Sequence, residues 1–206
     1  MATDPPFVHR MFRMATDASI ELIAAFARIG VDCVYIGDSY ASGSVISPQM
    51  YREFCIPAYR RAADAAHTLG LLVYKHCCGN YNPFLPLMAD NHLDGMEGLD
   101  PTSGMTVAHT REVIGDRLCL IGGVSCLSLL QARPEQVHAE AMACIRAGGA
   151  DGRYVLGSAC AVPRYTPVEN MRALARAGWG SCAGIRNPDF DSPGNQTPWG
   201  AECRIG

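Results

Sequence analysis

Short apolar runs alternate with longer amphipathic stretches along the first 177 residues of the chain. The apolar runs predict five strands, and stretches with apolar residues at helical spacing predict the helices between them. The expected strands span 33–36, 71–75, 95–99, 118–121 and 153–156. The expected helices span 17–29, 48–69, 82–90, 107–114, 134–147 and 167–177. This alternation is typical of an α/β fold in which every connection crosses over to a parallel strand.

Residues that begin or break helices refine the first two helical stretches. Thr16 or Asp17 is expected to cap the first helix. Ser47 caps the second, and Pro48 takes its first helical position. Pro57 lies inside that second stretch, and because proline has no backbone N–H we expect it to kink or interrupt the helix.

Composition excludes several classes of function. The chain has 206 residues, is 49% hydrophobic and carries a net charge of −3 with a pI near 6.0, which describes a globular protein without a nucleic-acid-binding surface. No apolar run approaches the roughly 20 residues that span a bilayer. The amino terminus lacks the basic and apolar blocks of a signal peptide, so a cytoplasmic location is expected.

Ten cysteines require an explanation in a chain of this size. Without a secretion signal, free thiols are expected rather than a disulfide framework. Cys33, Cys55, Cys119 and Cys144 lie inside periodic apolar segments, where a thiol behaves as a small buried hydrophobe. Cys77 is expected to pack against the helical layer, because it points to the opposite side of its strand from its two neighbours.

A different role is expected for the motif His76-Cys77-Cys78-Gly79, which ends the second strand. His76 and Cys78 stand two positions apart, and Cys160 follows the last strand. Three such ligands can hold one zinc ion and leave a coordination position open, as a catalytic zinc site requires. Any one of these residues alone would be better explained as part of the core.

Other polar residues and glycines follow the expected strands. Glu97 is either a fourth metal ligand, an acid–base group near the metal, or an ordinary loop carboxylate. Asp38 could orient the substrate or a zinc-bound group. Gly122 and Gly123 could let a ligand approach the backbone closely, or could serve tight packing inside the fold.

Chemistry in parallel barrels gathers at the carboxyl ends of the strands, where all of these residues are expected. Five strands are nevertheless too few to close such a barrel, which takes eight strands and typically about 250 residues. The expected fold is therefore a partial (β/α)8 barrel over residues 1–177. Residues 178–206 lose apolar periodicity and are expected to form an irregular or disordered tail.

Several motifs in order resemble the uroporphyrinogen decarboxylase superfamily, and within it most closely the branch of corrinoid methyltransferases. They are ISPQMYREF at 46–54, PAY at 57–59, Gly70, HCCG at 76–79, GDR at 115–117, IGGV at 121–124 and YTPVEN at 165–170. The resemblance covers about residues 4–177 and implies the carboxyl-terminal part of an eight-stranded barrel, so that the chain is expected to be a fragment. It implies zinc held by His76, Cys78 and Cys160, a methylated corrinoid on a partner protein as methyl donor, and a small thiol as acceptor.

Two other interpretations stay open at this point. The decarboxylase branch needs no metal and would connect the chain with haem biosynthesis, although soft ligands at the strand ends favour methyl transfer. The fragment could also be inactive, or active only after assembly with a missing half, because an open parallel sheet exposes unpaired edge groups. The sequence leaves the oligomeric state open.

Overall fold

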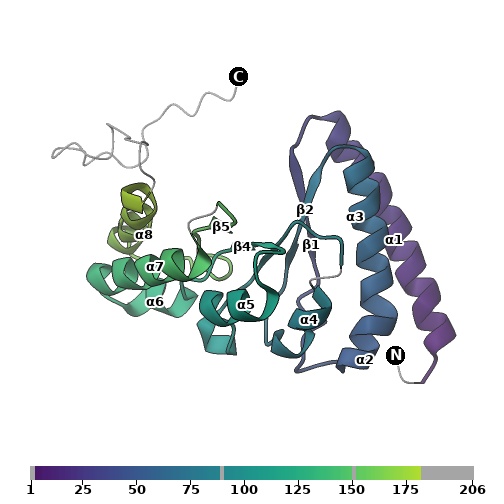
Figure 1. Ribbon diagram of the computed structural model, residues 1–206, viewed down its shortest axis with the longest axis horizontal. Coiled ribbons are helices and arrows are strands. Elements are labelled where there is room, and N and C mark those ends of the chain that lie inside the picture. The colour runs from purple at the N-terminus through teal and green to yellow at the C-terminus, as the bar shows by residue number, and fades with distance from the viewer. Residues whose placement is uncertain (1–2, 89–90, 150–151, 182–206) are drawn as a thin grey trace.

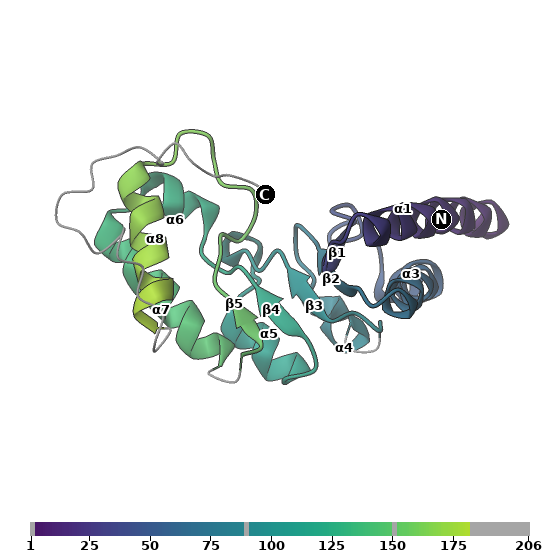
Figure 2. The same ribbon diagram turned by 90° about the horizontal axis from the view of Figure 1, so that it is seen from above.

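Five parallel strands form one open sheet. The computed structural model describes residues 3–88, 91–149 and 152–181. The strands are β1 (Cys33–Gly37), β2 (Leu72–His76), β3 (Gly95–Glu97), β4 (Cys119–Ile121) and β5 (Tyr154–Val155). They are hydrogen-bonded in the order β1-β2-β3-β4-β5, and every pair is parallel. The predicted α/β class and five strand–helix units are confirmed, and Figure 2 shows the strands as an open row.

Helices follow the strands as the alternating pattern predicts. They are α1 (Pro5–Arg28), α2 (Pro48–Met50), α3 (Ile56–Thr68), α4 (Leu85–Met88), α5 (Val107–Ile114), α6 (Cys126–Gln131), α7 (Pro134–Gly148) and α8 (Val168–Ser181). Figure 1 shows α1 and α3 side by side at the β1 end of the sheet, and α6, α7 and α8 together at the other end. The short helix α6, which Ser125 caps, is absent from the sequence prediction.

Helix α1 begins much earlier than predicted. Its cap is Asp4, whose carboxylate accepts a hydrogen bond from the Phe7 N–H at 3.0 Å, and Pro5 occupies the first turn. Thr16, one of the two expected caps, lies inside the helix and donates its hydroxyl hydrogen to the Phe12 carbonyl at 2.7 Å. The prediction of a start at Asp17 was therefore wrong, because an aspartate followed by proline is itself a helix-start signal.

The interruption expected at Pro57 is confirmed in the form of a wide turn. Between α2 and α3 the chain forms a π-helical segment, Tyr51–Cys55, and Pro57 lies in the first turn of α3. Proline cannot donate the backbone hydrogen bond that a continuous helix would need there, and the wider turn accommodates the missing bond. The segment buries Tyr51 and Phe54.

The two faces of the sheet differ sharply in exposure. Val73, Met96 and Leu120 point toward the helices and are fully buried in the core. On the opposite face, Tyr35 is 64% exposed and Leu72 is 54% exposed. Strand side chains alternate between faces, so the described residues bury one face and leave the inner face, which would line a closed barrel, largely uncovered.

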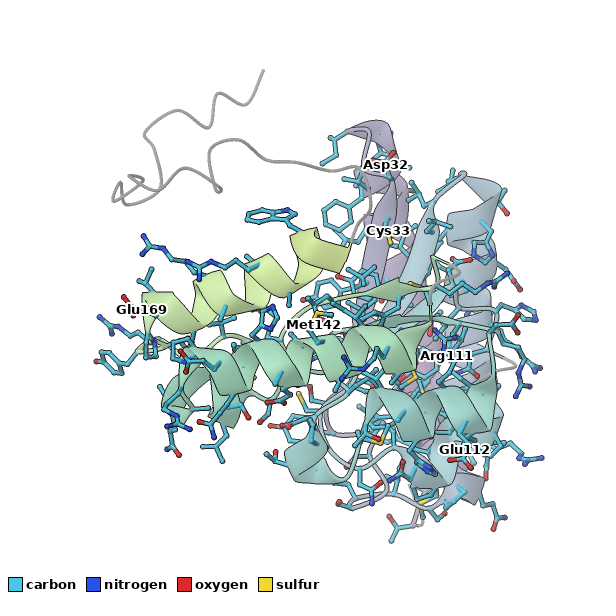
Figure 3. All side chains as sticks on the ribbon, turned by 60° about the vertical axis from the view of Figure 1, so that its left-hand side comes forward. Asp32, Cys33, Arg111, Glu112, Met142 and Glu169 are labelled. Atoms are coloured by element: carbon cyan, nitrogen blue, oxygen red, sulfur yellow. The ribbon has the colours of Figure 1, made fainter. Side chains whose placement is uncertain are left out.

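Arg111 connects the layers near β4 and β5. Its guanidinium donates hydrogen bonds to the carbonyl oxygens of Gly115, Leu118, Gly148 and Arg153, at 2.8 to 3.3 Å. The side chain therefore joins α5 to the loops that border the last two strands (Figure 3). Leu118 and Arg153 directly precede β4 and β5, so Arg111 stabilises the amino ends of these two strands, opposite to the end from which the chain continues to Cys160.

The carboxyl-terminal helix is longer than predicted. Helix α8 continues through Ser181, beyond the end predicted at Ala177. The rest of the expected irregular tail, 182–206, lies outside the described residues, as do 89–90 at the expected end of the helix over 82–90. None of the described helices combines the length and the apolar character needed to cross a membrane.

Candidate metal centre

Three potential metal ligands from distant parts of the chain come together at one edge of the sheet. The Sγ atoms of Cys78 and Cys160 are 3.6 Å apart, across 82 residues of sequence. His76 Nε2 lies 3.3 Å from the Cys78 sulfur and 3.8 Å from the Cys160 sulfur. A tetrahedral zinc ion with ordinary Zn–S and Zn–N bonds separates its ligand atoms by about 3.5 to 3.8 Å. The three atoms therefore fit one zinc ion, with a fourth position left for another ligand.

Strand β2 positions the first two ligands. His76 ends the strand, and its backbone carbonyl accepts a hydrogen bond from the Asp38 N–H at 3.3 Å. The chain then turns at Gly79, whose φ of 91° is a conformation that glycine adopts without strain. The Gly43 N–H donates to the Asn80 carbonyl at 2.9 Å, which holds this turn against the loop after β1.

The loop after β5 positions the third ligand. Beyond the last strand, Val124 and Ser158 form an isolated parallel bridge that extends the pairing of β4 and β5. The Ala159 N–H donates to the Val124 carbonyl at 2.7 Å, and the Ser158 hydroxyl donates to the Cys160 carbonyl at 2.6 Å. Backbone hydrogen bonds therefore fix the position of Cys160 within this loop.

Hydrogen-bonding neighbours move the two thiol pKa values in opposite directions. Burial raises the pKa of Cys78, but hydrogen bonds from three neighbours, Ser39, His76 and Cys160, outweigh it and bring the pKa below that of an ordinary thiol. Burial raises the pKa of Cys160, and its contact with Cys78 raises it further. Burial lowers the pKa of His76, but the bonds to Cys78 and Glu97 leave it above its ordinary value. Cys78 is therefore the sulfur that more readily forms a thiolate, the state that binds metals.

Glu97 lies behind the histidine rather than among the ligand atoms. Its Oε2 is 3.0 Å from His76 Nδ1, the ring nitrogen that faces away from the sulfurs. The two residues are register partners on β3 and β2, which explains the contact. A carboxylate on the second nitrogen fixes the ring orientation and strengthens the histidine as a ligand. The roles first expected for Glu97, fourth ligand or acid–base group, stay predictions.

A small hollow opens beside this site on the inner face of the sheet. It has a volume of about 250 Å³ and is lined by Tyr35, Tyr74, His76, Glu97, Cys160 and Ala161. The rings of Tyr35 and Tyr74 stack, with centroids 5.8 Å apart. A small molecule in this hollow would contact the ligand set on one side and aromatic rings on the other.

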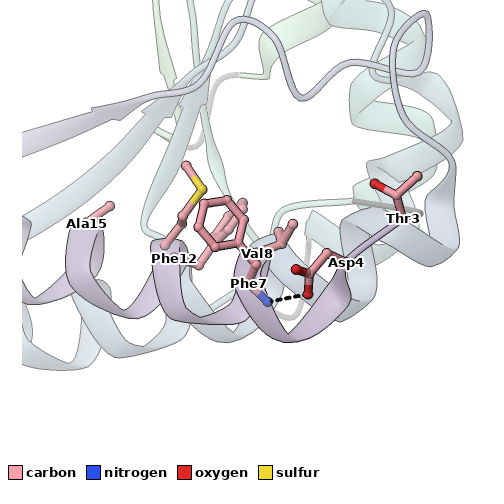
Figure 4. Close-up of a pocket in the computed structure, with 7 residues that line it drawn as sticks. Thr3, Asp4, Phe7, Val8, Phe12 and Ala15 are labelled. Atoms are coloured by element: carbon pink, nitrogen blue, oxygen red, sulfur yellow. Dashed lines mark hydrogen bonds between the residues drawn. The ribbon is translucent and has the colours of Figure 1, made fainter.

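A second, larger hollow has a lining that shares no residue with this site. It has a volume of about 540 Å³ and runs along the amino-terminal part of α1, where Phe7 and Met11 belong to its mostly apolar lining (Figure 4). Its carboxylate, that of Asp4, caps the helix. Because no polar groups converge there, this groove has the character of an uncovered helix face and not of a reactive site.

Asp38 lies apart from the ligand set and binds a group of residues that the sequence did not point to. Its Oδ2 is 2.9 Å from Lys75 Nζ, and its Oδ1 accepts a hydrogen bond from the Tyr81 hydroxyl at 2.9 Å. Lys75 is fully buried in the middle of an apolar strand. A lysine within such a strand is the signal that could have indicated a buried ion pair. The substrate-orienting role expected for Asp38 stays a prediction.

The two glycines after β4 make close contacts with protein atoms. A Cβ on Gly122 would lie 2.6 Å from the Ser158 carbonyl oxygen, and a Cβ on Gly123 would collide with a methyl group of Val107. Both have positive φ angles, 95° and 111°. Packing accounts for both residues, which is one of the two alternatives that the sequence left open. A contact between them and a bound ligand stays a prediction.

The cysteines that were predicted to pack in the core differ in how far they are buried. Cys55 and Cys77 are buried, as predicted for packing residues, whereas Cys119 and Cys144 are partly buried. The prediction for Cys33 was wrong, because this thiol lies on the uncovered inner face of the sheet and is exposed. Burial raises the pKa of Cys55 and that of Cys77 to about 12, which keeps both thiols protonated at neutral pH.

Comparison with known proteins gives the family. The family model for uroporphyrinogen decarboxylase (URO-D) matches residues 1–178 of the chain. The chain belongs to the uroporphyrinogen decarboxylase family. Within that family it is similar to a methylated-thiol–coenzyme M methyltransferase of Methanosarcina mazei, with 34% identity over 85% of this chain and 45% of that protein. It is also 32% identical to the methylcobamide:CoM methyltransferase MtaA of Methanosarcina barkeri, over 81% of this chain and 48% of the relative.

A solved structure from the family has the same arrangement of elements. The methyltransferase from Methanosarcina mazei superposes with a TM-score of 0.73 at 32% sequence identity, over 82% of this chain and 48% of that one. Family members named uroporphyrinogen decarboxylase are also similar, among them that of Chlorobium phaeovibrioides with 27% identity over 68% of this chain. The chain spans about half the length of the methyltransferases that it matches.

Proposed function

We propose that this chain carries the metal-binding segment of a zinc-dependent methyltransferase, which moves a methyl group from a methylated corrinoid protein to a small thiol. The observation that carries this proposal is the convergence of His76, Cys78 and Cys160 within 3.8 Å of one another. The similarity to methylcobamide:CoM methyltransferases supports it independently. Coenzyme M is accordingly the first acceptor to test.

The residues of the site have separate tasks in this proposal. His76, Cys78 and Cys160 would hold the zinc ion, and Glu97 would fix the imidazole through Nδ1. A zinc ion bound there supplies a positive charge that lowers the pKa of a coordinated acceptor thiol, so that a thiolate exists at neutral pH. The hollow between Tyr35, Tyr74 and the ligand set would receive the acceptor. The corrinoid partner would approach from the carboxyl ends of the strands, where the three ligands lie.

Decarboxylation of uroporphyrinogen is the second candidate, because decarboxylases of the family are also similar to this chain. That reaction acts on a polyanionic tetrapyrrole and needs no metal. The described residues around the hollow bring together sulfur and imidazole ligands instead. One imidazole nitrogen and two sulfur atoms this close together are typical of a zinc site, which favours methyl transfer.

Zinc content separates the two candidates. We expect about one zinc ion per purified chain, loss of the metal in Cys78→Ser, and retention in Cys126→Ser. Cys126 is a matched control, because it is another partly buried cysteine beside Cys160, with its sulfur 3.5 Å from the Ala161 carbonyl. Metal-free wild-type protein that decarboxylates uroporphyrinogen would overturn the proposal. Turnover of methylcobalamin with coenzyme M is measured separately, because the chain contains all three proposed ligands but spans only about half the length of its relatives.

A further inference from the structure

A buried lysine directly precedes the first metal ligand. The side chain of Lys75 is 0% exposed and points away from the site, toward α3 and the π-helical segment. Its Nζ lies 2.8 Å from the Tyr51 hydroxyl, 3.1 Å from the Tyr59 hydroxyl and 2.9 Å from Asp38 Oδ2. These three neighbours account for the three hydrogens of the ammonium group. We call this group the Asp38 cluster; it comprises Lys75, Asp38, Tyr51, Tyr59 and Tyr81.

Within the Asp38 cluster, the carboxylate binds the chain on both sides of the ligand segment. Before His76, Asp38 Oδ2 accepts a hydrogen bond from Lys75. After Cys78, Asp38 Oδ1 accepts one from the Tyr81 hydroxyl at 2.9 Å. The Asp38 backbone N–H also donates to the carbonyl of His76 itself. Asp38 thus binds one residue before the segment His76–Cys78, one within it and one after it.

We propose that Asp38 is a positioning residue that fixes the segment His76–Cys78 for metal binding, and that Lys75 is the buried counter-ion that holds Asp38 in place. This inference rests on the proposed function, because it concerns the same metal. Neither residue touches the ligand atoms of the site. Their effect would reach the metal through the backbone on either side of His76 and Cys78, which sets where the imidazole and the sulfur point.

An apolar side chain at position 75 could also fill the space between the strand and the helices. Taking an ammonium and a carboxylate out of water is costly, and a hydrophobic pair of similar volume is often at least as stable. A fully hydrogen-bonded ion pair, in contrast, holds the Asp38 carboxylate in one orientation. In that orientation Oδ1 faces the Tyr81 hydroxyl, on the far side of the ligand segment.

Two tyrosine variants test the positioning role with a matched control. Tyr81→Phe and Tyr59→Phe each remove one buried hydroxyl from the Asp38 cluster, but of the two only Tyr81 binds Asp38 and follows the ligand segment. We expect Tyr81→Phe to weaken zinc binding about tenfold or more, the usual effect of losing an outer-shell partner. Tyr59→Phe should change it by less than about threefold. The measurement is competition with a chromophoric zinc chelator, together with the cobalt-to-thiolate absorption of the Co²⁺-loaded chain.

A double variant keeps the test decisive if a single substitution prevents folding. Lys75→Met with Asp38→Asn removes both charges at once and leaves no unpaired buried ion. We expect this variant to fold, to bind zinc at least about tenfold more weakly, and to show a changed cobalt spectrum.

The outcomes distinguish this inference from the proposed function. Wild-type chain that binds zinc, with Tyr81→Phe and the double variant binding equally tightly, would overturn the positioning role and leave the metal site standing. Wild-type chain that binds no zinc would overturn the metal site and the positioning role together. Equal losses in Tyr81→Phe and Tyr59→Phe would indicate general loosening of the core and would also overturn the role assigned to Asp38.

Discussion

Replacing Glu97 with alanine should weaken zinc binding about tenfold, because the carboxylate orients the ring of His76. The two groups are 3.0 Å apart, and their side chains are 19% and 27% exposed. A hydrogen bond to a charged group contributes about 1.5 to 3 kcal/mol, and partial exposure to water favours the lower end of that range. A loss of about 1.4 kcal/mol corresponds to a tenfold change in the dissociation constant.

Zinc dissociation constants from chelator competition at neutral pH measure this effect. Glu97→Gln keeps an acceptor oxygen for the Nδ1 hydrogen but loses the charge, so we expect a smaller change than in Glu97→Ala. Glu112→Gln is the control, since that side chain is 81% exposed on α5, away from the site. An unchanged affinity in Glu97→Ala would refute the reasoning. Complete loss of zinc would instead indicate that Glu97 is itself a ligand.

Two further predictions concern the folded chain as a whole. The free energy of unfolding should fall by about 4 kcal/mol between pH 9 and pH 12 through Cys55 alone, at about 1.4 kcal/mol per pH unit. Burial raises the pKa of this thiol from 9.0 to about 12, so its contribution to the free energy of unfolding is complete below pH 9 and is lost as the pH rises. Urea titrations of wild type and Cys55→Ala at pH 8 to 11 test this prediction. Equal pH dependence of the free energy of unfolding in the two proteins would contradict it. The second prediction is that the 206-residue chain by itself binds a hydrophobic dye and elutes from a size-exclusion column above its monomer mass, because Tyr35 and Leu72 are exposed on the uncovered face of the sheet. Substitution of both residues by lysine should reduce the dye binding and the apparent mass. A monomer with a sharp, cooperative thermal transition would argue against this second prediction.

The sequence predicts the strands and the proposed ligands because both depend on local, diagnostic patterns. When all connections are parallel crossovers, a strand that ends in His76-Cys77-Cys78 and a later strand followed by Cys160 carry these residues at the same edge of the sheet. The metal-site expectation therefore needs only residue types and the order of elements. Pro57 and Ser47 likewise act on their own surroundings, and the structure has the predicted interruption and cap.

Features that depend on distant partners were not predictable from one sequence. Lys75 interrupts an apolar strand, but nothing local connects it with Tyr51, Tyr59 and Asp38, which come from separate elements. Cys33 lies in an apolar strand like any packing residue. Its exposure follows from the uncovered inner face, which depends on the whole arrangement of the sheet.

The pairing order of the sheet has a thermodynamic consequence for the proposed metal. Two of the ligands follow β2 and the third follows β5, and these strands are separated by β3 and β4. Their side chains can meet only while the sheet stays curled, so flattening it would pull the ligand atoms apart. An ion held between Cys78 and Cys160 would act as a cross-link over 82 residues, and its occupancy would resist uncurling. At a free zinc concentration of 100 times the dissociation constant, that linkage amounts to about 2.7 kcal/mol in favour of the curled state.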